Sequence, residues 1–173
     1  MIKKLQKEDA VEVLRRIYKD SSTKTLIIDD GSSSGWQETD RFPKMGECEL
    51  LIKDIQIPEN LHAFLTEVRE YYSTQKEARF LFLEEEYVKA RETIEVECDE
   101  ASLDEILKFV DDAPNFDAVL VDASFSWVLK LHHESFGYFT GSNQICNALK
   151  SNQTLSRLLQ NPVIADGAVD GVP

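Results

Sequence analysis

The stretch that decides the fold runs from residue 118 to residue 139: Ala118-Val-Leu-Val-Asp-Ala-Ser-Phe-Ser-Trp-Val-Leu-Lys-Leu-His-His-Glu-Ser-Phe-Gly-Tyr-Phe139. It contains three apolar runs, at residues 118–121, 126–132 and 136–139, with only short polar breaks between them. Parallel strands need a crossover of about a dozen residues, whereas antiparallel strands can be joined by a short turn. The stretch therefore predicts an antiparallel meander.

Apolar periodicity predicts the elements around this meander. Helices are expected over residues 7–19, from Pro58 to Tyr72, from the capping box that starts at Ser102, over 143–150 and over 154–160. Strands are expected over residues 25–28, 46–57, 78–83 and 93–98. We therefore expect an α+β fold with a mainly antiparallel sheet and helices packed on one face. A single domain over residues 1–160 and a loose C-terminal tail over 161–173 are predicted.

Composition indicates a globular chain. Of the 173 residues, 42% are hydrophobic and 29% are charged, which is an ordinary mixture for a packed domain. The chain has no run of about 18 apolar residues, so no membrane-spanning helix is expected. The basic residues near Met1 are not followed by an apolar stretch, so no secretory signal is expected. These features favour a cytoplasmic protein.

The three cysteines, Cys48, Cys98 and Cys146, lie far apart and form no CxxC pair. That spacing does not favour a zinc site or a redox dithiol, and no cofactor is expected. We expect buried or half-buried free thiols in a reducing cytoplasm.

The net charge of −13 is concentrated in the middle of the chain. Residues 84–117, which we call the acidic block, hold thirteen acidic and three basic side chains, a net charge of −10. Such a block repels nucleic acid and anionic membranes and attracts a basic protein partner. The partner-binding residues expected from this pattern are Glu84, Glu85, Glu86, Asp111 and Asp112.

Two tryptophans invite different interpretations. Trp36 follows the Gly- and Ser-rich loop of residues 31–35, where it could be a lid over the core or an aromatic anchor for the partner. Trp127 alternates with Phe125, Leu129 and Leu131, which predicts a core position.

The run His132-His133-Glu134 offers an alternative function. With Asp122, these residues could form a metal-dependent or acid–base hydrolase site. Adjacent residues of a strand point to opposite faces, however, and the HExxH pattern is absent, so the run alone does not predict a metal site. A third possibility is a structural subunit of an assembly, which would form a stable oligomer.

The stretch from Phe116 to Gly141 resembles the end of the sheet in small bacterial immunity proteins of polymorphic or contact-dependent toxin systems. The resemblance implies a cytoplasmic, acidic, metal-free bacterial protein that neutralises one toxin. This family has no universal motif, so the resemblance assigns no residue role. Many such toxins are nucleases with basic clefts, which an acidic block could occupy in place of nucleic acid. The sequence therefore favours a non-catalytic protein-binding module.

Overall fold

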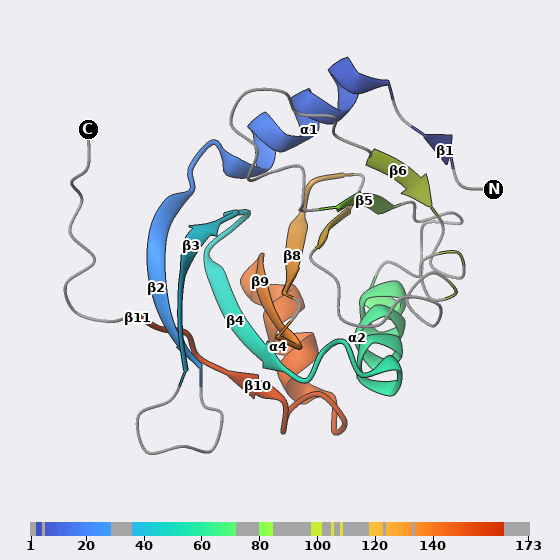
Figure 1. The fold of residues 1–173 in the computed structure, drawn as a ribbon. Coiled ribbons are helices and arrows are strands. Elements are labelled where there is room, and N and C mark those ends of the chain that lie inside the picture. The colour runs from blue at the N-terminus through green and yellow to red at the C-terminus, as the bar shows by residue number, and fades with distance from the viewer. Residues whose placement is uncertain are drawn as a thin grey trace.

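The structure is a computed structural model that describes residues 3–4, 6–28, 36–71, 80–84, 98–101, 105, 108, 118–122, 124–132 and 134–164. These residues form an α+β fold with two antiparallel sheets (Figure 1). The described helices are α1 (Lys7–Tyr18), α2 (Pro58–Tyr71) and α4 (Asn143–Ser151). None of them is long and apolar enough to cross a membrane.

The large sheet has the strand order β1-β6-β5-β7-β8-β9-β4-β10. Its strands are β1 (Lys3–Lys4), β4 (Cys48–Lys53), β5 (Phe80–Glu84), β6 (Cys98–Ala101), β7 (Ala118–Asp122), β8 (Trp127–His132), β9 (Phe136–Gly141) and β10 (Leu159–Gln160). The small sheet has the order β11-β2-β3, formed by β11 (Val163–Ile164), β2 (Ser22–Ile28) and β3 (Trp36–Phe42). Every pairing described in the two sheets is antiparallel, which confirms the predicted fold class.

The predicted meander forms the centre of the large sheet as β7, β8 and β9. Leu129 of β8 lies between Leu120 on one neighbour and Phe139 on the other. Both connecting turns are tight, and each contains one residue with positive φ, Phe125 (58°) and Ser135 (65°). All residues of the three strands are buried on both faces, which explains why they are apolar almost without interruption.

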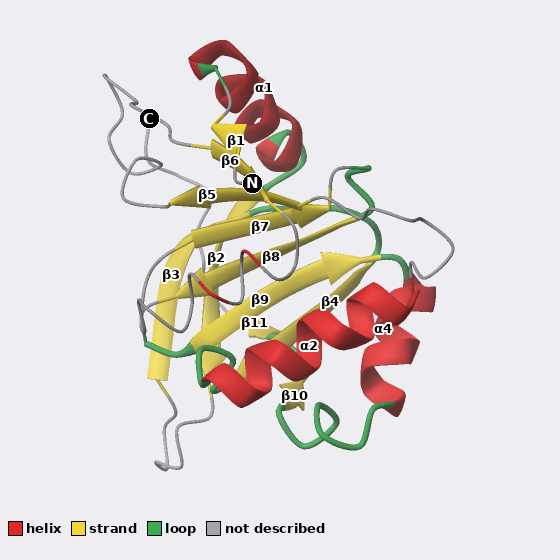
Figure 2. Ribbon diagram, turned by 90° about the vertical axis from the view of Figure 1, so that its right-hand side faces the viewer, coloured by secondary structure: helices red, strands yellow, loops and turns green. Residues whose placement is uncertain are grey.

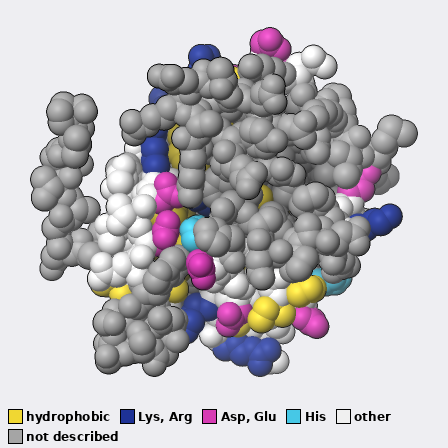
Figure 3. Space-filling model, viewed as in Figure 1, with side chains coloured by type: hydrophobic (Ala, Val, Ile, Leu, Met, Phe, Trp, Pro, Cys, Tyr) yellow, Lys and Arg dark blue, Asp and Glu magenta, His cyan; other side chains and the backbone are white. Residues whose placement is uncertain are grey.

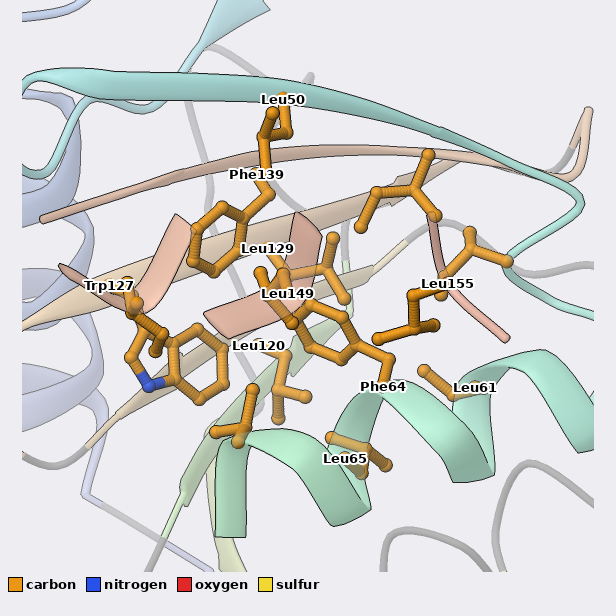
Figure 4. Close-up of a cluster of buried hydrophobic side chains, with 14 of the residues drawn as sticks. Leu50, Leu61, Phe64, Leu65, Leu120, Trp127, Leu129, Phe139, Leu149 and Leu155 are labelled. Carbon is orange, nitrogen blue, oxygen red and sulfur yellow. The ribbon is translucent and has the colours of Figure 1, made fainter. Parts of the chain in front are cut away.

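One face of the large sheet is covered by α2 and α4, as Figure 2 shows. Phe64 of α2 packs edge-on against Trp127 and Phe139, with ring centroids 6.0 and 5.7 Å apart (Figure 4). Trp127 is fully buried here, so its predicted core position is confirmed. We call this face the apolar face.

The opposite face is shared by α1 and the small sheet. α1 packs its apolar side on Val119, Val121 and Val128. The small sheet closes a second cluster, formed by Leu26, Ile28, Phe42, Leu51, Phe136 and Tyr138. Helices α2 and α4 therefore share one face as expected, while α1 lies on the other, where alternate residues of β7 and β8 are also apolar and need cover.

The structure corrects two expectations for the C-terminal part of the chain and adds a strand that was not expected. Residues 153–158 form turns rather than the predicted helix over 154–160, and the chain continues into β10. The loose tail is expected to start at residue 161, but Val163 pairs with Ile27, so the fold continues to Ile164. β3 was not predicted, because its alternate residues are charged rather than apolar.

The expectation of free thiols is wrong for Cys48 and Cys146, which form a disulfide across 98 residues of sequence, with 6.4 Å between their Cα atoms. Sequence spacing hides this pair because the sheet register brings it together. Cys48 pairs with Gly141 in the β4–β9 ladder, and α4 begins two residues after Gly141. One further turn of helix then places Cys146 over Cys48, and the bond fastens α4 to the apolar face.

Reduction of this disulfide should lower the free energy of unfolding by about 4 kcal/mol, because the bond closes a long loop in the unfolded chain. Denaturant unfolding with and without reductant measures the change, and a Cys98→Ser variant is the control, since it leaves the bond in place. One thiol per chain should react in the denatured, unreduced protein. Three reactive thiols, or equal unfolding midpoints, would contradict the assignment.

Candidate functional site

The predicted partner-binding residues are only partly covered by the structure. Glu84 is the last residue of β5 and Trp36 is the first residue of β3, and in both cases the backbone position is described. Glu85, Glu86, Asp111 and Asp112 lie outside the described residues. Their grouping on one surface therefore stays a prediction, as does the choice between lid and anchor for Trp36.

The residues of the alternative hydrolase site are held apart where they are described. Asp122 lies beside the start of β8 and His132 at its end, about 16 Å away for a five-residue strand separation. The Asp122 carboxylate accepts hydrogen bonds from the hydroxyls of Ser124 and Ser126, which holds the β7–β8 turn. Asp122 thus supports a turn and does not meet His132, while His133 lies outside the described residues.

A row of charged side chains instead joins the two sheets. It consists of three pairs, each with one residue from the small sheet and one from the large sheet, and we call it the inter-sheet row: Lys24 with Glu49, Asp40 with Lys130, and Glu38 with His132. Figure 3 shows acidic side chains gathered around a histidine on this side of the molecule. Asp40 and Glu38 on β3 face Lys130 and His132 at alternate positions of β8.

Lys130 is the most buried cation of the row, with 2% of its side chain exposed. Its Nζ lies 2.8 Å from Asp40 Oδ2 and donates to the carbonyl oxygen of Arg41 at 3.1 Å. The ammonium also lies 5.0 Å from the ring centroid of Phe42. A buried ammonium is stable only with such compensation, so Lys130 requires β3 to lie over β8.

Lys24 and Glu49 form the second pair, with Lys24 Nζ 2.7 Å from Glu49 Oε1 and 3.0 Å from the Tyr138 hydroxyl. Burial raises the pKa of Glu49, but the hydrogen bonds from Lys24 and Tyr138 and the positive charges of Lys24 and Lys44 outweigh it, so this pKa lies below its ordinary value. Burial, together with the nearby Glu49, raises the pKa of the Tyr138 phenol far above its ordinary value, and the phenol stays protonated.

His132 completes the row, and its hydrogen bonds define its tautomer. Its Nδ1 accepts a hydrogen bond from the backbone N–H of Glu134 at 3.2 Å. The neutral ring therefore carries its hydrogen on Nε2, which lies 3.5 Å from Glu38 Oε1. The ring stacks on Phe136 with centroids 4.6 Å apart, and Gln56 donates to the His132 carbonyl at 2.6 Å. This environment fixes the ring in the sheet interface.

The described residues line a cavity that contains none of the residues of the row. It has a volume of about 230 Å³ and lies between β4, β10 and the end of α4. Its lining residues are Leu50, Lys150, Ser156, Leu159, Gln160 and Asn161. Among the described residues, no group of three or more His, Cys, Asp or Glu side chains is arranged to hold a metal ion. The arrangement of the row can hold two sheets in register, and this is the role that its contacts support.

Sequence reasoning missed most of the row, although one signal was present. Lys130 and His132 occupy alternate positions of an otherwise apolar strand, so both point to the same buried face. Buried charged groups need partners, and acids at the same two-residue spacing stand at positions 38 and 40. The match between these two spacings could have predicted that residues 38 and 40 lie on a strand that packs over β8.

The Lys24–Glu49 pair should make the free energy of unfolding depend on pH. The folded-state pKa of Glu49 is lowered from 4.5, so its contribution is complete above about pH 4.5 and is lost as the pH falls through the folded value. Glu49→Gln should therefore lower the free energy of unfolding by about 1 kcal/mol at pH 7, and by less at pH 3.5. Denaturant unfolding at both pH values measures this difference, and an equal loss at both would contradict it.

No protein-family model, no curated protein and no solved structure matches this chain. The function proposed below is therefore inferred from the chain's own residues and their arrangement.

Proposed function

We propose that the chain is a non-catalytic module that binds a basic protein through the acidic block of residues 84–117. The form we favour is an immunity-type inhibitor of a basic toxin domain. The observation that carries the proposal is the net charge of −10 within these 34 consecutive residues. A surface of that sign speeds the approach of a cationic partner and disfavours nucleic acid.

The register of β5, β6 and β7 supports a concentrated charge. Leu83 pairs with Cys98 and Glu84 pairs with Ala118, so the first residue of the acidic block, Cys98 within it and Ala118 just after it lie on neighbouring strands. The chain therefore leaves β5, enters β6 and enters β7 at the same end of the sheet. Strands separated by one neighbour lie about 10 Å apart, so these three points fall within one partner-sized surface.

The pairing of the buried cations supports the proposal in a second way. Lys130 and Lys24 are neutralised by Asp40 and Glu49, which belong to β3 and β4. Each of these two cations therefore has a carboxylate partner outside the acidic block. Asp122 is engaged by the β7–β8 turn, which favours a structural role for it over a catalytic one.

Charge reversal tests the proposal. A triple variant, Glu84→Lys, Glu85→Lys and Glu86→Lys, should slow association with the basic partner at least tenfold at low salt. A second variant, Asp111→Lys with Asp112→Lys, should act in the same direction, and Trp36→Ala should speed dissociation if Trp36 is an anchor. The partner is obtained by co-purification from the native host, and binding rates are measured at 50 and 500 mM salt.

The matched control is Glu8→Lys, Asp9→Lys and Glu12→Lys on α1, because all three side chains are exposed and the change in net charge is the same. An equal slowing in the control would show that only total charge matters and would contradict a localised site. Stoichiometric zinc, manganese or iron in the purified protein would favour the alternative hydrolase around His132, His133 and Glu134.

A further inference from the structure

We propose that the cavity between β4, β10 and the end of α4 binds a small organic anion, of the class of short aliphatic carboxylates. This site goes beyond the binding of a basic protein, because β4 and β10 form the edge of the large sheet opposite to the edge with β5 and β6. The cavity has a volume of about 230 Å³, and its lining combines apolar side chains with one cation and no acid: Leu50, Lys150, Ser156, Leu159, Gln160 and Asn161.

Two leucines form the apolar part of the cavity. Leu50 on β4 is buried in the core of the apolar face, and Leu159 on β10 packs against the same core. Leu159 pairs with Ile52, so its side chain lies on the same side of the sheet as those of Ile52 and Leu50. Water at an apolar surface is poorly held, and its displacement by an apolar group favours binding. This part of the cavity therefore suits a short aliphatic chain.

Side chains that can donate hydrogen bonds form the polar part. Lys150, in the last turn of α4, supplies an ammonium group. Ser156 supplies a hydroxyl, and amides come from Gln160 and Asn161. Lys150 is exposed and forms no ion pair with the residues that the structure describes. Since the lining residues include no Asp or Glu, their formal charge is positive, and a carboxylate at the head of the chain complements it.

Two features of the molecule oppose an anion at this place, and both are weaker than the contact with Lys150. The acidic block begins at Glu84 on β5, which lies four strand spacings, or about 19 Å, from β4. That separation exceeds the Debye length of about 8 Å at physiological salt, so this end of the block is screened. The C-terminus of α4 carries a partial negative charge, but the Leu149 carbonyl there already accepts the Asn152 N–H.

The cavity also touches the segment that joins the two sheets. Leu159 and Gln160 form β10, which pairs with β4, and Val163 in β11 pairs with Ile27 of the small sheet. A strand of two residues opens easily, because few hydrogen bonds hold it. A bound carboxylate contacts Leu159, Gln160 and Asn161 together, so it should slow hydrogen exchange in the β10–β4 ladder.

An NMR titration of the full chain with hexanoate at pH 7 and 150 mM salt tests the site. Resonances of Leu159 and Gln160 should shift in a saturable way, with a dissociation constant of about 1 mM. Acetate should bind at least tenfold more weakly, because it lacks the chain that covers the leucines. Hexylamine, which has the same chain and the opposite charge, should cause no saturable shift at these residues.

Variants of the lining separate a defined site from general attraction of anions. Lys150→Gln should weaken hexanoate binding at least fivefold, because it removes the charged donor. Ser156→Leu, which fills the cavity without changing the charge, should weaken binding by a similar factor. Arg157→Gln is the matched control, because Arg157 is exposed and lies next to Ser156 but outside the lining, and it should change the affinity less than twofold.

Three results would overturn the proposal. The first is the absence of saturable shifts at Leu159 and Gln160 up to 50 mM hexanoate. The second is equal binding of hexylamine and hexanoate. The third is an affinity for hexanoate that survives both Lys150→Gln and Ser156→Leu, or that Arg157→Gln lowers as much as Lys150→Gln does.

Discussion

The burial of Lys130 is the constraint on which the arrangement of the two sheets depends. β8 is the middle strand of the meander, and both of its faces are covered, so a lysine on it cannot reach water. Asp40, the Arg41 carbonyl and the Phe42 ring compensate the charge from one short segment of β3. Since a buried ammonium without such contacts is costly, the small sheet must sit where β3 crosses β8.

The two faces of the large sheet consequently do different work. On the apolar face, one hydrophobic side chain can replace another of similar volume, and only the fit of their shapes distinguishes good packing from poor packing. On the other face, charges at a two-residue spacing accept one register, because a one-residue slip would turn Glu38 and Asp40 to solvent. The apolar face supplies stability, and the inter-sheet row specifies how the small sheet is placed.

Much of the fold could be predicted because local pattern and burial agree. The runs around Leu120, Leu129 and Phe139 are apolar on both faces, and the short breaks between them allow only antiparallel turns. α1, α2 and α4 follow apolar periodicity and lie close to their expected bounds. Here each residue's environment is set by its near neighbours in sequence.

The remaining features depend on contacts that are distant in sequence. β3 is charged at alternate positions because its partners are on β8, some 90 residues away, and periodicity of apolar residues cannot detect it. The same reason hides the Cys48–Cys146 bond, which exists only once β4 lies beside β9. For function, the acidic block could be recognised from composition, whereas the row that orders the sheets shows only in the matching two-residue spacing of its acids and bases.

A double-mutant cycle on Lys130 and Asp40 tests the central claim most directly. Lys130→Met and Asp40→Leu are made singly and together, and the free energy of unfolding is measured for all four proteins. Asp40→Leu should cost about 3 kcal/mol, because it takes the carboxylate away from the buried Lys130 ammonium, whereas Lys130→Met should cost less, because Asp40 is partly exposed. The double variant should regain most of the larger loss. Losses that add to within about 0.5 kcal/mol would show that the pair is not coupled and that it does not hold the sheets together.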